Sequence, residues 1–535
     1  LSNGPYSIMI SNSGTGYSHW EDIDVTRWMP DATTDELGTF IYVKDVERDT
    51  YWSSSYAPVN VSSNFFNVDF KADKAKFTRR DIGIETVTEI VVSPEDNVEI
   101  RSLTLANLSM RTRILEVTSY AEVALAPHAA DRAHPAFSKM FIETEHHEEH
   151  GGLLAFRRQR APSDPKHFAM HIAAVEHPMQ AQTFETSRER FIGLGNDLAS
   201  PEAMRGSLTN QTGYVLDPIF SIRQKVVLEP GKRVSISFIT GIATSRKDVL
   251  ALMQKYKEFS ATQRAIDMAW TNAELKLRYM HVTYDSIRLF LQLASRILYP
   301  HIHLRASMEF LWRNKLNQSG LWPHGISGDL PIVAITIGNL YELDTLRETL
   351  IAHTFWRMQG LKCDLIILNE ERSSYEQDLQ QQIKRLIEAN SQLTGINKPG
   401  GIYLFCLDQM QHDDLVLIFF VSRIVINASR GSLRKHLAIP IPVTRLSPYL
   451  IPPKKYHEEP SPPLPFLELH FFNGIGGFTT DGKEYAIYIE AKKLPPHPWI
   501  NVIANQNFGS LLSAKGMGCS WHRNSQMNQI GRAHV

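Results

Sequence analysis

NGPYSIMISNSGTGYSHWEDIDVTRW, residues Asn3 to Trp28, is the stretch that decides the fold, because a shortened copy of its middle returns about five hundred residues later. The copy is LLSAKGMGCSW, residues Leu511 to Trp521. Each copy runs from an apolar strand through a polar corner into Gly-x-Gly-x-Ser and an aromatic residue. Two glycines around one residue are typical of a tight, bulged turn between strands, where a positive φ costs little. The repeat therefore predicts that the chain begins the same kind of module twice.

Length, composition and charge exclude several classes of protein. A chain of 535 residues with 43% hydrophobic and 10% aromatic residues is typical of three to four packed domains and not of a disordered protein. The formal net charge of -1 and the pI of about 7.2 give no basic field that could hold a phosphate backbone. We therefore expect no nucleic-acid partner.

The three cysteines, Cys363, Cys406 and Cys519, are widely spaced and odd in number. They form neither a disulfide framework nor a zinc-binding pattern, and they favour a reducing compartment. No other pattern predicts a metal or a cofactor.

The most apolar run, residues 415–426, is interrupted by Ser422 and Arg423 and is too short to span a bilayer. We therefore expect this segment itself to be soluble. The chain begins with Leu1 and has no signal-peptide pattern, so we expect its N-terminus to be a cut inside a longer protein.

Residues 1–244 predict a large antiparallel β-sandwich. Residues 115–125 alternate between apolar and polar side chains, which indicates a strand with one buried face. Phe66, Val68, Phe70 and Ala72 alternate in the same way. Near the end of this region, Glu229-Pro230-Gly231-Lys232 separates two apolar strands and predicts a hairpin between them.

Residues 245–316 predict a helical linker, with Ser245 as an N-terminal cap and apolar residues at three- and four-residue steps. Residues 317–437 predict a small α/β module, because buried strands near residues 332–337, 363–368, 402–407 and 423–426 alternate with helices. Strands joined in this way are expected to be parallel. Asp413-Asp414 is expected to begin a helix and not to act as a catalytic pair.

Residues 438–470 are rich in proline and predict an extended linker. Residues 471–529 predict the start of a second, truncated β-sandwich. Residues 530–535, IGRAHV, break the preceding pattern abruptly, and we expect them to be a non-native tail encoded by a translated sequencing adapter.

The run Glu145-His146-His147-Glu148-Glu149-His150 resembles a metal-binding sequence in composition. Its order is not the His-Glu-x-x-His that places two imidazoles on one helical face, and two glycines follow at once. A solvated turn without a metal is the favoured interpretation.

Trp20, Asp22, Asp24, Arg27 and Trp28 could form a sugar site, because carboxylates and Arg bind hydroxyl groups while a Trp face stacks on a sugar ring. The alternative is a capped strand edge with a buried Trp.

Several motifs carry a family resemblance: Phe472-Asn473-Gly474, Gly476-Gly477-Phe478, Asp481-Gly482-Lys483-Glu484-Tyr485, Pro498-Trp499-Ile500-Asn501 and Gly516-x-Gly518-x-Ser520-Trp521. They resemble the opening of the cellobiose and chitobiose phosphorylases, glycoside hydrolase family 94. With Gln318-Ser319-Gly320-Leu321-Trp322 and residues 325–331 ahead of them, the tandem arrangement is similar to the phosphorylase-type C-terminal region of cyclic β-1,2-glucan synthases. The resemblance covers nearly the whole chain.

The resemblance implies a galactose mutarotase-like super-sandwich that belongs to a very large inner-membrane enzyme. Such an enzyme builds β-1,2-glucan from UDP-glucose, cyclises it and adjusts chain length by phosphorolysis on the cytoplasmic side of the membrane. β-Glucan and inorganic phosphate are then partners of the parent enzyme, and the membrane is reached only through parts outside this chain.

In that family the catalytic residues lie in an (α/α)₆ barrel after the second sandwich, so no residue of this chain inherits a catalytic role. The resemblance also implies that two copies could form a homodimer in which the sandwich lends loops to the neighbouring active site. This leaves a supporting, carbohydrate-binding role for Tyr17, Trp20, Asp22, Arg27 and Trp28. The alternative is a structural or glucan-binding scaffold with no direct part in catalysis.

Overall fold

The computed structural model describes the chain except for residues 30–34, 160, 178–181, 372–377, 391–394, 439–464, 490–494, 496, 515, 517, 526, 527, 534 and 535. The described residues form two units, one before residue 439 and one after residue 464. Most of the proline-rich linker predicted over 438–470 lies outside the described residues. The predicted fold class, mainly β with a small α/β part, is confirmed.

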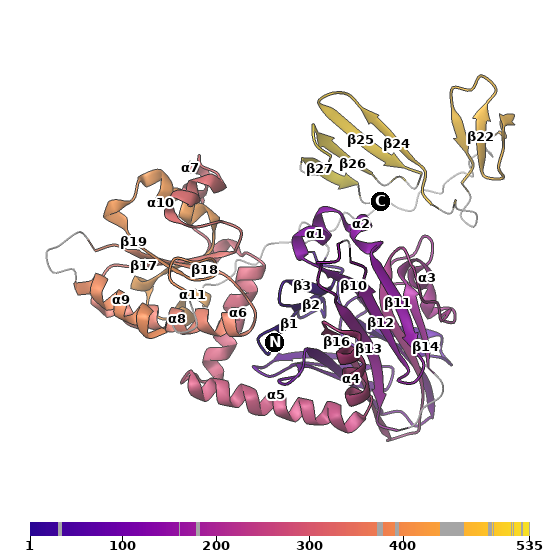
Figure 1. Ribbon diagram of the computed structural model, residues 1–535, viewed down its shortest axis with the longest axis horizontal. Helices are drawn as coiled ribbons and strands as arrows, with labels where there is room; N and C mark the ends of the chain where they lie inside the picture. Colours follow the sequence, from indigo (N-terminus) through magenta and orange to yellow (C-terminus); the bar gives the residue numbers. More distant parts are fainter. Residues whose placement is uncertain are drawn as a thin grey trace, which may run out of the picture. The chain divides into compact units, whose positions relative to one another are not determined.

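The first unit begins with two eight-stranded antiparallel sheets (Figure 1). The first sheet has the order β1-β2-β3-β10-β15-β14, and β4 pairs with β10 and with β5. Its strands are β1 (Tyr6–Ile10), β2 (Gly16–Trp20), β3 (Ile23–Thr26), β4 (Phe40–Asp45), β5 (Thr50–Ser53), β10 (Arg113–Ala126), β14 (Thr183–Ser187) and β15 (Pro218–Leu228). The alternation predicted over residues 115–125 lies in β10, which pairs with β15 on one side and with β3 and β4 on the other.

The second sheet has the order β11-β12-β13-β16-β9-β8-β7-β6. Its strands are β6 (Phe65–Phe70), β7 (Ala75–Asp81), β8 (Ile84–Val92), β9 (Val98–Asn107), β11 (Ile142–His147), β12 (Gly152–Arg157), β13 (Phe168–Val175) and β16 (Arg233–Ala243). The core between the two sheets includes Val117, Phe220 and Ile222 from the first and Leu103, Leu105 and Phe238 from the second. Apolar side chains that alternate along each strand therefore meet in one shared interior.

Two expectations about individual strands were wrong. The turn around Pro230-Gly231 forms, with Lys232 N–H donating to Glu229 O at 3.1 Å, but β15 and β16 belong to different sheets and are not a hairpin. A turn sequence predicts that the chain reverses direction, but it does not determine whether the next strand pairs in the same sheet or in the other sheet. β6 shows no fully buried face, since Phe66 and Phe70 are each 38% exposed and Val68 packs only partly buried against the core; it is the edge strand of its sheet.

The helical segment is divided between two cores. α4 (Arg246–Tyr256) and α5 (Phe259–Tyr279) cover the outer face of the second sheet, where Val249 and Met253 join Ile100 and Ile239. α6 (Tyr284–Leu298) packs instead on the α/β module, and its Phe290 O accepts a hydrogen bond from Trp356 Nε1 at 2.8 Å. Ser245 caps α4 by accepting a hydrogen bond from Asp248 N–H, as predicted.

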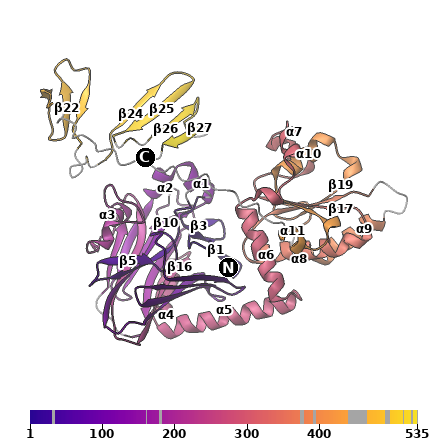
Figure 2. The ribbon, with the colours of Figure 1, turned by 180° about the vertical axis from the view of Figure 1, so that it is seen from behind.

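The α/β module has four parallel strands in the order β19-β18-β17-β20, which confirms the predicted parallel pairing. The strands are β17 (Ile332–Ile337), β18 (Asp364–Asn369), β19 (Ile402–Cys406) and β20 (Ser422–Asn427). α8 (Leu343–Met358) and α9 (Asp378–Asn390) cover one face, and α10 (His412–Val421) covers the other (Figures 1 and 2). Asp413 and Asp414 lie in the first turn of α10, as predicted.

The second unit contains two small antiparallel sheets. One has the strands β21 (Leu469–His470), β22 (Gly476–Thr479) and β23 (Tyr485–Ile487); the other has β24 (Ile500–Ala504), β25 (Phe508–Ser513), β26 (Gly518–His522) and β27 (Gln529–Ala533). Every residue of β24 is exposed. Among the helices that the structure describes in either unit, none is long and apolar enough to cross a membrane.

Candidate functional site

The first Gly-x-Gly motif shapes the hairpin of β1 and β2. Gly14 and Gly16 have φ values of +97° and +141°, which side chains rarely adopt. A Cβ on Gly16 would lie 1.9 Å from Met9 O, so the two strands approach too closely for any side chain. The predicted tight turn is confirmed, and it presents Tyr17, His19 and Trp20 on β2.

The second motif forms the same hairpin in β25 and β26. Ile10 pairs with Gly16 in the first copy, and Leu512 pairs with Gly518 in the second. A Cβ on Gly518 would lie 1.9 Å from Leu511 O, which is the same steric restriction as at Gly16. The repeat found in the sequence is therefore a repeat of strand register as well as of residue type.

The five predicted sugar-binding residues are not all on one surface. Asp22 is exposed and Tyr17 is half-buried, whereas Trp20, Arg27 and Trp28 are buried. Tyr17 stacks on Trp28, with ring centroids 5.1 Å apart and an angle of 3° between the planes. The structure thus brings Tyr17 and Trp28 together and separates Arg27 from solvent.

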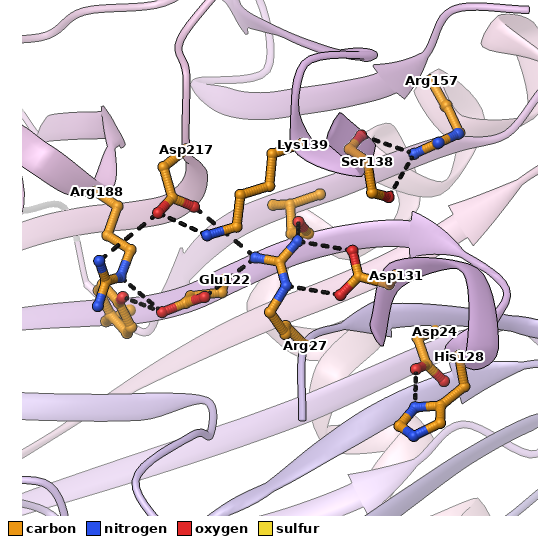
Figure 3. A network of polar contacts seen from close by, with 12 residues as sticks. Asp24, Arg27, Glu122, His128, Asp131, Ser138, Lys139, Arg157, Arg188 and Asp217 are labelled. Atoms are coloured by element: carbon orange, nitrogen blue, oxygen red, sulfur yellow. Dashed lines mark hydrogen bonds and ion pairs between the residues drawn. The ribbon is translucent and has the colours of Figure 1, made fainter. Parts of the chain in front are cut away.

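Arg27 lies in a buried network of charged side chains (Figure 3). Its Nε donates to Asp131 Oδ2 at 2.8 Å, and its Nη1 donates to Glu122 Oε2 at 3.1 Å. These contacts join the end of β3 to β10 and to α1 (His128–Ala133). With its polar atoms directed at these carboxylates, Arg27 stabilises the sandwich and offers no free donor toward a sugar in this arrangement.

Asp24 forms a second polar centre, between two histidines. Its carboxylate lies 2.9 Å from His19 Nδ1 and 2.7 Å from His128 Nδ1. Burial alone would raise the pKa of Asp24, but hydrogen bonds from His128 and His19 hold this pKa below its usual range. The hydrogen bond to Asp24 also raises the pKa of His128. Asp24 therefore orients His19 and fixes α1 on the sandwich.

A cleft of about 530 Å³ opens beside this centre, between the β1–β2 hairpin, α6 and the residues that follow α8. Tyr17, His19, Glu21 and Asp22 supply polar groups to its wall, and α6 supplies Leu291 and Leu298 among others. Trp20, Arg27 and Trp28 do not line it. Burial and the neighbouring Asp24 carboxylate raise the pKa of Tyr17 to about 12, so its phenol keeps its proton at neutral pH.

Sequence reasoning missed several residues of the cleft. Glu21 adjoins a predicted site residue, and a wider reading of the Trp20–Trp28 stretch could have included it. Ser295 and Lys362 also line the cleft, but they come from α6 and from the chain beyond α8. No local pattern connects these positions with β2, because they meet it only through tertiary packing.

The family described as glycosyl hydrolase 94, supersandwich domain, matches residues 1–259 and 483–534, which together make up more than half of the chain. The chain belongs to this family. The predicted resemblance to glycoside hydrolase family 94 is thereby confirmed, and the same family description matches both copies of the repeated hairpin.

Two curated relatives resemble the chain over different lengths. Cyclic β-(1,2)-glucan synthase NdvB of Rhizobium meliloti (strain 1021) is 35% identical over 553 residues, which cover 99% of this chain and 19% of that protein. N,N′-diacetylchitobiose phosphorylase of Vibrio furnissii is 24% identical over 271 residues, which cover 50% of this chain and 33% of that enzyme. This member of the glycosyl hydrolase 94 family thus spans between a fifth and a third of the length of these relatives.

Among solved structures, a bacterial glucoamylase complexed with acarbose aligns with 50% of this chain and 35% of its own, at 6% identity and a TM-score of 0.33.

Proposed function

We propose that this chain is a glucan-binding, non-catalytic part of a glycoside phosphorylase-type region that acts in β-glucan synthesis and chain-length control. Membership of the glycosyl hydrolase 94 family and the similarity to the glucan synthase support the class of substrate. The single observation that carries the proposal is the cleft beside the β1–β2 hairpin, with its mixture of polar and apolar walls.

The cleft has the size and chemistry that a short glucan segment requires. Ligand pockets usually measure about 300 to 1,000 Å³ and combine apolar walls with a few polar groups, and this cleft lies within that range. The carboxylates of Glu21 and Asp22 can accept hydrogen bonds from sugar hydroxyls. Leu291 and Leu298 offer apolar surface to the C–H faces of a pyranose ring.

We infer that the chain alone breaks no glycosidic bond. Glycosyl transfer needs a general acid at the leaving oxygen and a second carboxylate or phosphate on the opposite face of the sugar. Glu21 and Asp22 are sequence neighbours in the turn between β2 and β3, so they are not placed to flank a sugar from two sides. Asp414, from the adjacent acidic pair on α10, lies 3.1 Å from His324 Nε2, away from the residues that line the cleft.

Binding is tested by titrating the purified full chain with linear β-1,2-glucan in a calorimeter. We expect Asp22→Asn to weaken binding about tenfold or more, since hydrogen bonds to charged groups contribute roughly 1.5 to 3 kcal/mol. The matched control is Glu229→Gln, which alters another exposed carboxylate, in the turn between β15 and β16. Equal affinity of the two variants would refute the assignment of the cleft.

A second measurement addresses catalysis. The chain incubated with linear β-1,2-glucan and phosphate should release no glucose 1-phosphate. Release that persists after repurification and is lost when a residue of the chain is replaced would show that the chain has a catalytic site.

The second candidate function is a structural scaffold without glucan binding. The observation that favours it is the burial of Trp20, Arg27 and Trp28, since these side chains stabilise the sandwich whether or not sugar is present. Absence of glucan binding in the same titration would select this function. In either case we infer, from the similarity to the synthase, that the parent enzyme brings glucan and phosphate together at the cytoplasmic face of an inner membrane and that two copies of the chain pair.

A further inference from the structure

The hairpin of β11 and β12 ends in the histidine-rich run. β11 continues to His147, which pairs with Gly152, and residues 148–151 form the turn between the strands. The turn is closed by a hydrogen bond from Gly151 N–H to His147 O of 2.9 Å. The predicted turn is thus confirmed for its second half, whereas His146 and His147 belong to the strand.

This turn brings together three potential metal ligands. His147, Glu149 and His150 each offer one ligand atom, and these atoms lie within 4.8 Å of one another. The two imidazole rings are stacked, with centroids 4.7 Å apart and an angle of 22° between the planes. His146 is not part of the cluster, because its ring stacks on Phe184. The turn therefore brings potential metal ligands close together, as the periodicity of a helix does for the two histidines of a His-Glu-x-x-His motif.

The imidazoles of this cluster also have unused ligand atoms. Nδ1 of His147 and Nδ1 of His150 are both buried, and no group among the described residues forms a hydrogen bond with either of them. Buried polar atoms in folded proteins nearly always have a partner, and an atom without one requires an explanation. Two imidazoles with unpartnered nitrogens, in residues that cluster with a carboxylate, form a donor set that suits a transition-metal ion.

We propose that His147, Glu149 and His150 bind one divalent transition-metal ion of the zinc type. Two imidazole nitrogens and one carboxylate oxygen act as ligands, and water completes a tetrahedral shell. An ion midway between two atoms 4.8 Å apart would lie about 2.4 Å from each, so small side-chain rotations reach the bond lengths of about 2.0 to 2.2 Å that zinc requires. Glu149 is exposed, so its side chain is free to make such a rotation.

The charges around the turn are compatible with a cation. The turn itself carries Glu148 and Glu149, and Lys257 donates to the backbone oxygen of Glu149 at 2.8 Å. The positive charge of Lys257 also acts on His150 and offsets part of the attraction of these carboxylates for a cation. Arg246, also near the turn, pairs with Glu145 at 2.7 Å. β11 is an edge strand of its sheet. A bound ion would therefore stabilise the turn of the β11–β12 hairpin at this edge.

The test titrates Zn²⁺ into the chelator-treated full chain in competition with a chromogenic zinc indicator. We expect one equivalent to bind, and we expect a tenfold or greater loss of affinity in each of His147→Gln, His150→Gln and Glu149→Gln. The matched control is His177→Gln, which removes an exposed histidine outside the turn and should leave affinity unchanged. Co²⁺ should give the intense visible absorption of a tetrahedral site in the unaltered chain and lose it in the double variant of both histidines.

Two further results decide the proposal. The melting temperature of the unaltered chain should rise with Zn²⁺, while the double variant should have the same melting temperature with and without Zn²⁺. Circular dichroism of each variant without metal establishes that it is folded. Absence of a stoichiometric site in the unaltered chain, or a site that all three ligand substitutions leave intact, would overturn the assignment.

Discussion

Replacing Arg27 with Met should destabilise the first unit far more than an ordinary loss of charge. The side chain of Arg27 is 3% exposed, and those of its partners Glu122 and Asp131 are 4% and 7% exposed. Met fills most of the volume of Arg but removes the guanidinium that pairs with Asp131 at 2.8 Å and with Glu122 at 3.1 Å (Figure 3). Glu122 then keeps its ion pair with Arg188, whereas Asp131 loses its closest cation. The Asp131 carboxylate is then a buried charge with little water and no close counter-ion to stabilise it.

The expected magnitude follows from this burial. Removing one partner of a buried ion pair typically costs about 3 to 5 kcal/mol in the free energy of unfolding. Arg188→Met is the matched control, because Arg188 contacts the same carboxylate at 2.8 Å but has a side chain that is 38% exposed. Water can replace a cation at such a site, and we expect this substitution to cost about 1 kcal/mol.

The loss of stability caused by Arg27→Met should also depend on pH. Burial by itself would raise the pKa of Glu122, but the cations Arg188, Arg27 and Lys139 hold this pKa below its usual range. A carboxylate with a lowered pKa in the folded state adds stability above its unfolded pKa of about 4.5, and this stability is lost as the pH falls through the folded value. Without Arg27 this contribution shrinks, so the deficit of Arg27→Met should be greatest at neutral pH and smaller near pH 4.

The assay is urea unfolding of the full chain, followed by far-UV circular dichroism at pH 7 and pH 4. A chain of several modules need not unfold in one step. The variants are therefore compared by the midpoint and slope of the transition in which the sandwich unfolds. A midpoint shift in Arg27→Met no larger than that in Arg188→Met would refute the argument. Loss of glucan binding in Arg27→Met at unchanged stability would refute it as well, and it would place Arg27 at the sugar.

Two more predictions concern the hairpins and the core. Gly16→Ala should lower the melting temperature of the first unit by several degrees, because the added Cβ would meet Met9 O at 1.9 Å, whereas Gly518→Ala should leave that transition unchanged. Burial, together with the positive Arg101, lowers the pKa of His171 to about 3. The unfolded chain therefore binds one more proton than the folded chain between about pH 3 and pH 6.5, so stability should decrease as the pH is lowered through this window, by up to about 1.4 kcal/mol per pH unit. His171→Gln should flatten the dependence of the urea midpoint on pH over this window, and an unchanged slope would contradict the assignment.

The sandwich was predictable from the sequence where one side chain in two faces a shared core. β10 shows this on one face, where Leu115, Val117, Val123 and Leu125 join the shared core, although its other face is buried as well from Val117 onward. Its three neighbouring strands, β3, β4 and β15, lie in the same sheet. β6 has the same alternation in sequence but lies at a sheet edge, where Val68 is only partly buried against the core. Alternation thus predicts that a strand has two unlike faces, and the tertiary packing against each face decides whether it is buried.

The helical segment shows a related limit. The three- and four-residue spacing of apolar side chains correctly predicted that this segment is helical, and α4, α5 and α6 each have a buried face. Periodicity indicates that a helix packs on a partner but does not identify the partner. The segment is therefore divided, with α4 and α5 on the sandwich and α6 on the α/β sheet, in a way that no local pattern specifies.

The candidate site was harder to predict because the residue types that bind sugars also stabilise buried cores. Arg27 has its partners Glu122 and Asp131 about a hundred residues further along the chain, so local sequence gave no sign of the ion network. Asp22, by contrast, lies in a turn between strands and is exposed, as a sugar ligand must be. A carboxylate next to a turn is therefore a better predictor of an accessible site than an Arg within a strand region.

The two copies of the hairpin separate local from tertiary determinants of this fold. In the first copy, Tyr6 and Trp20 are buried in the core of the sandwich, and Ser18 donates to Glu99 on the second sheet at 2.6 Å. In the second copy, Phe508, which occupies the place of Tyr6 in the register, is 47% exposed. The register and the close approach at the second glycine are nevertheless the same in both. Since the packing around the two hairpins differs, the shape that they share is attributable to features within the hairpins, among them the Gly-x-Gly-x-Ser sequence, and the core then determines which of their side chains are buried.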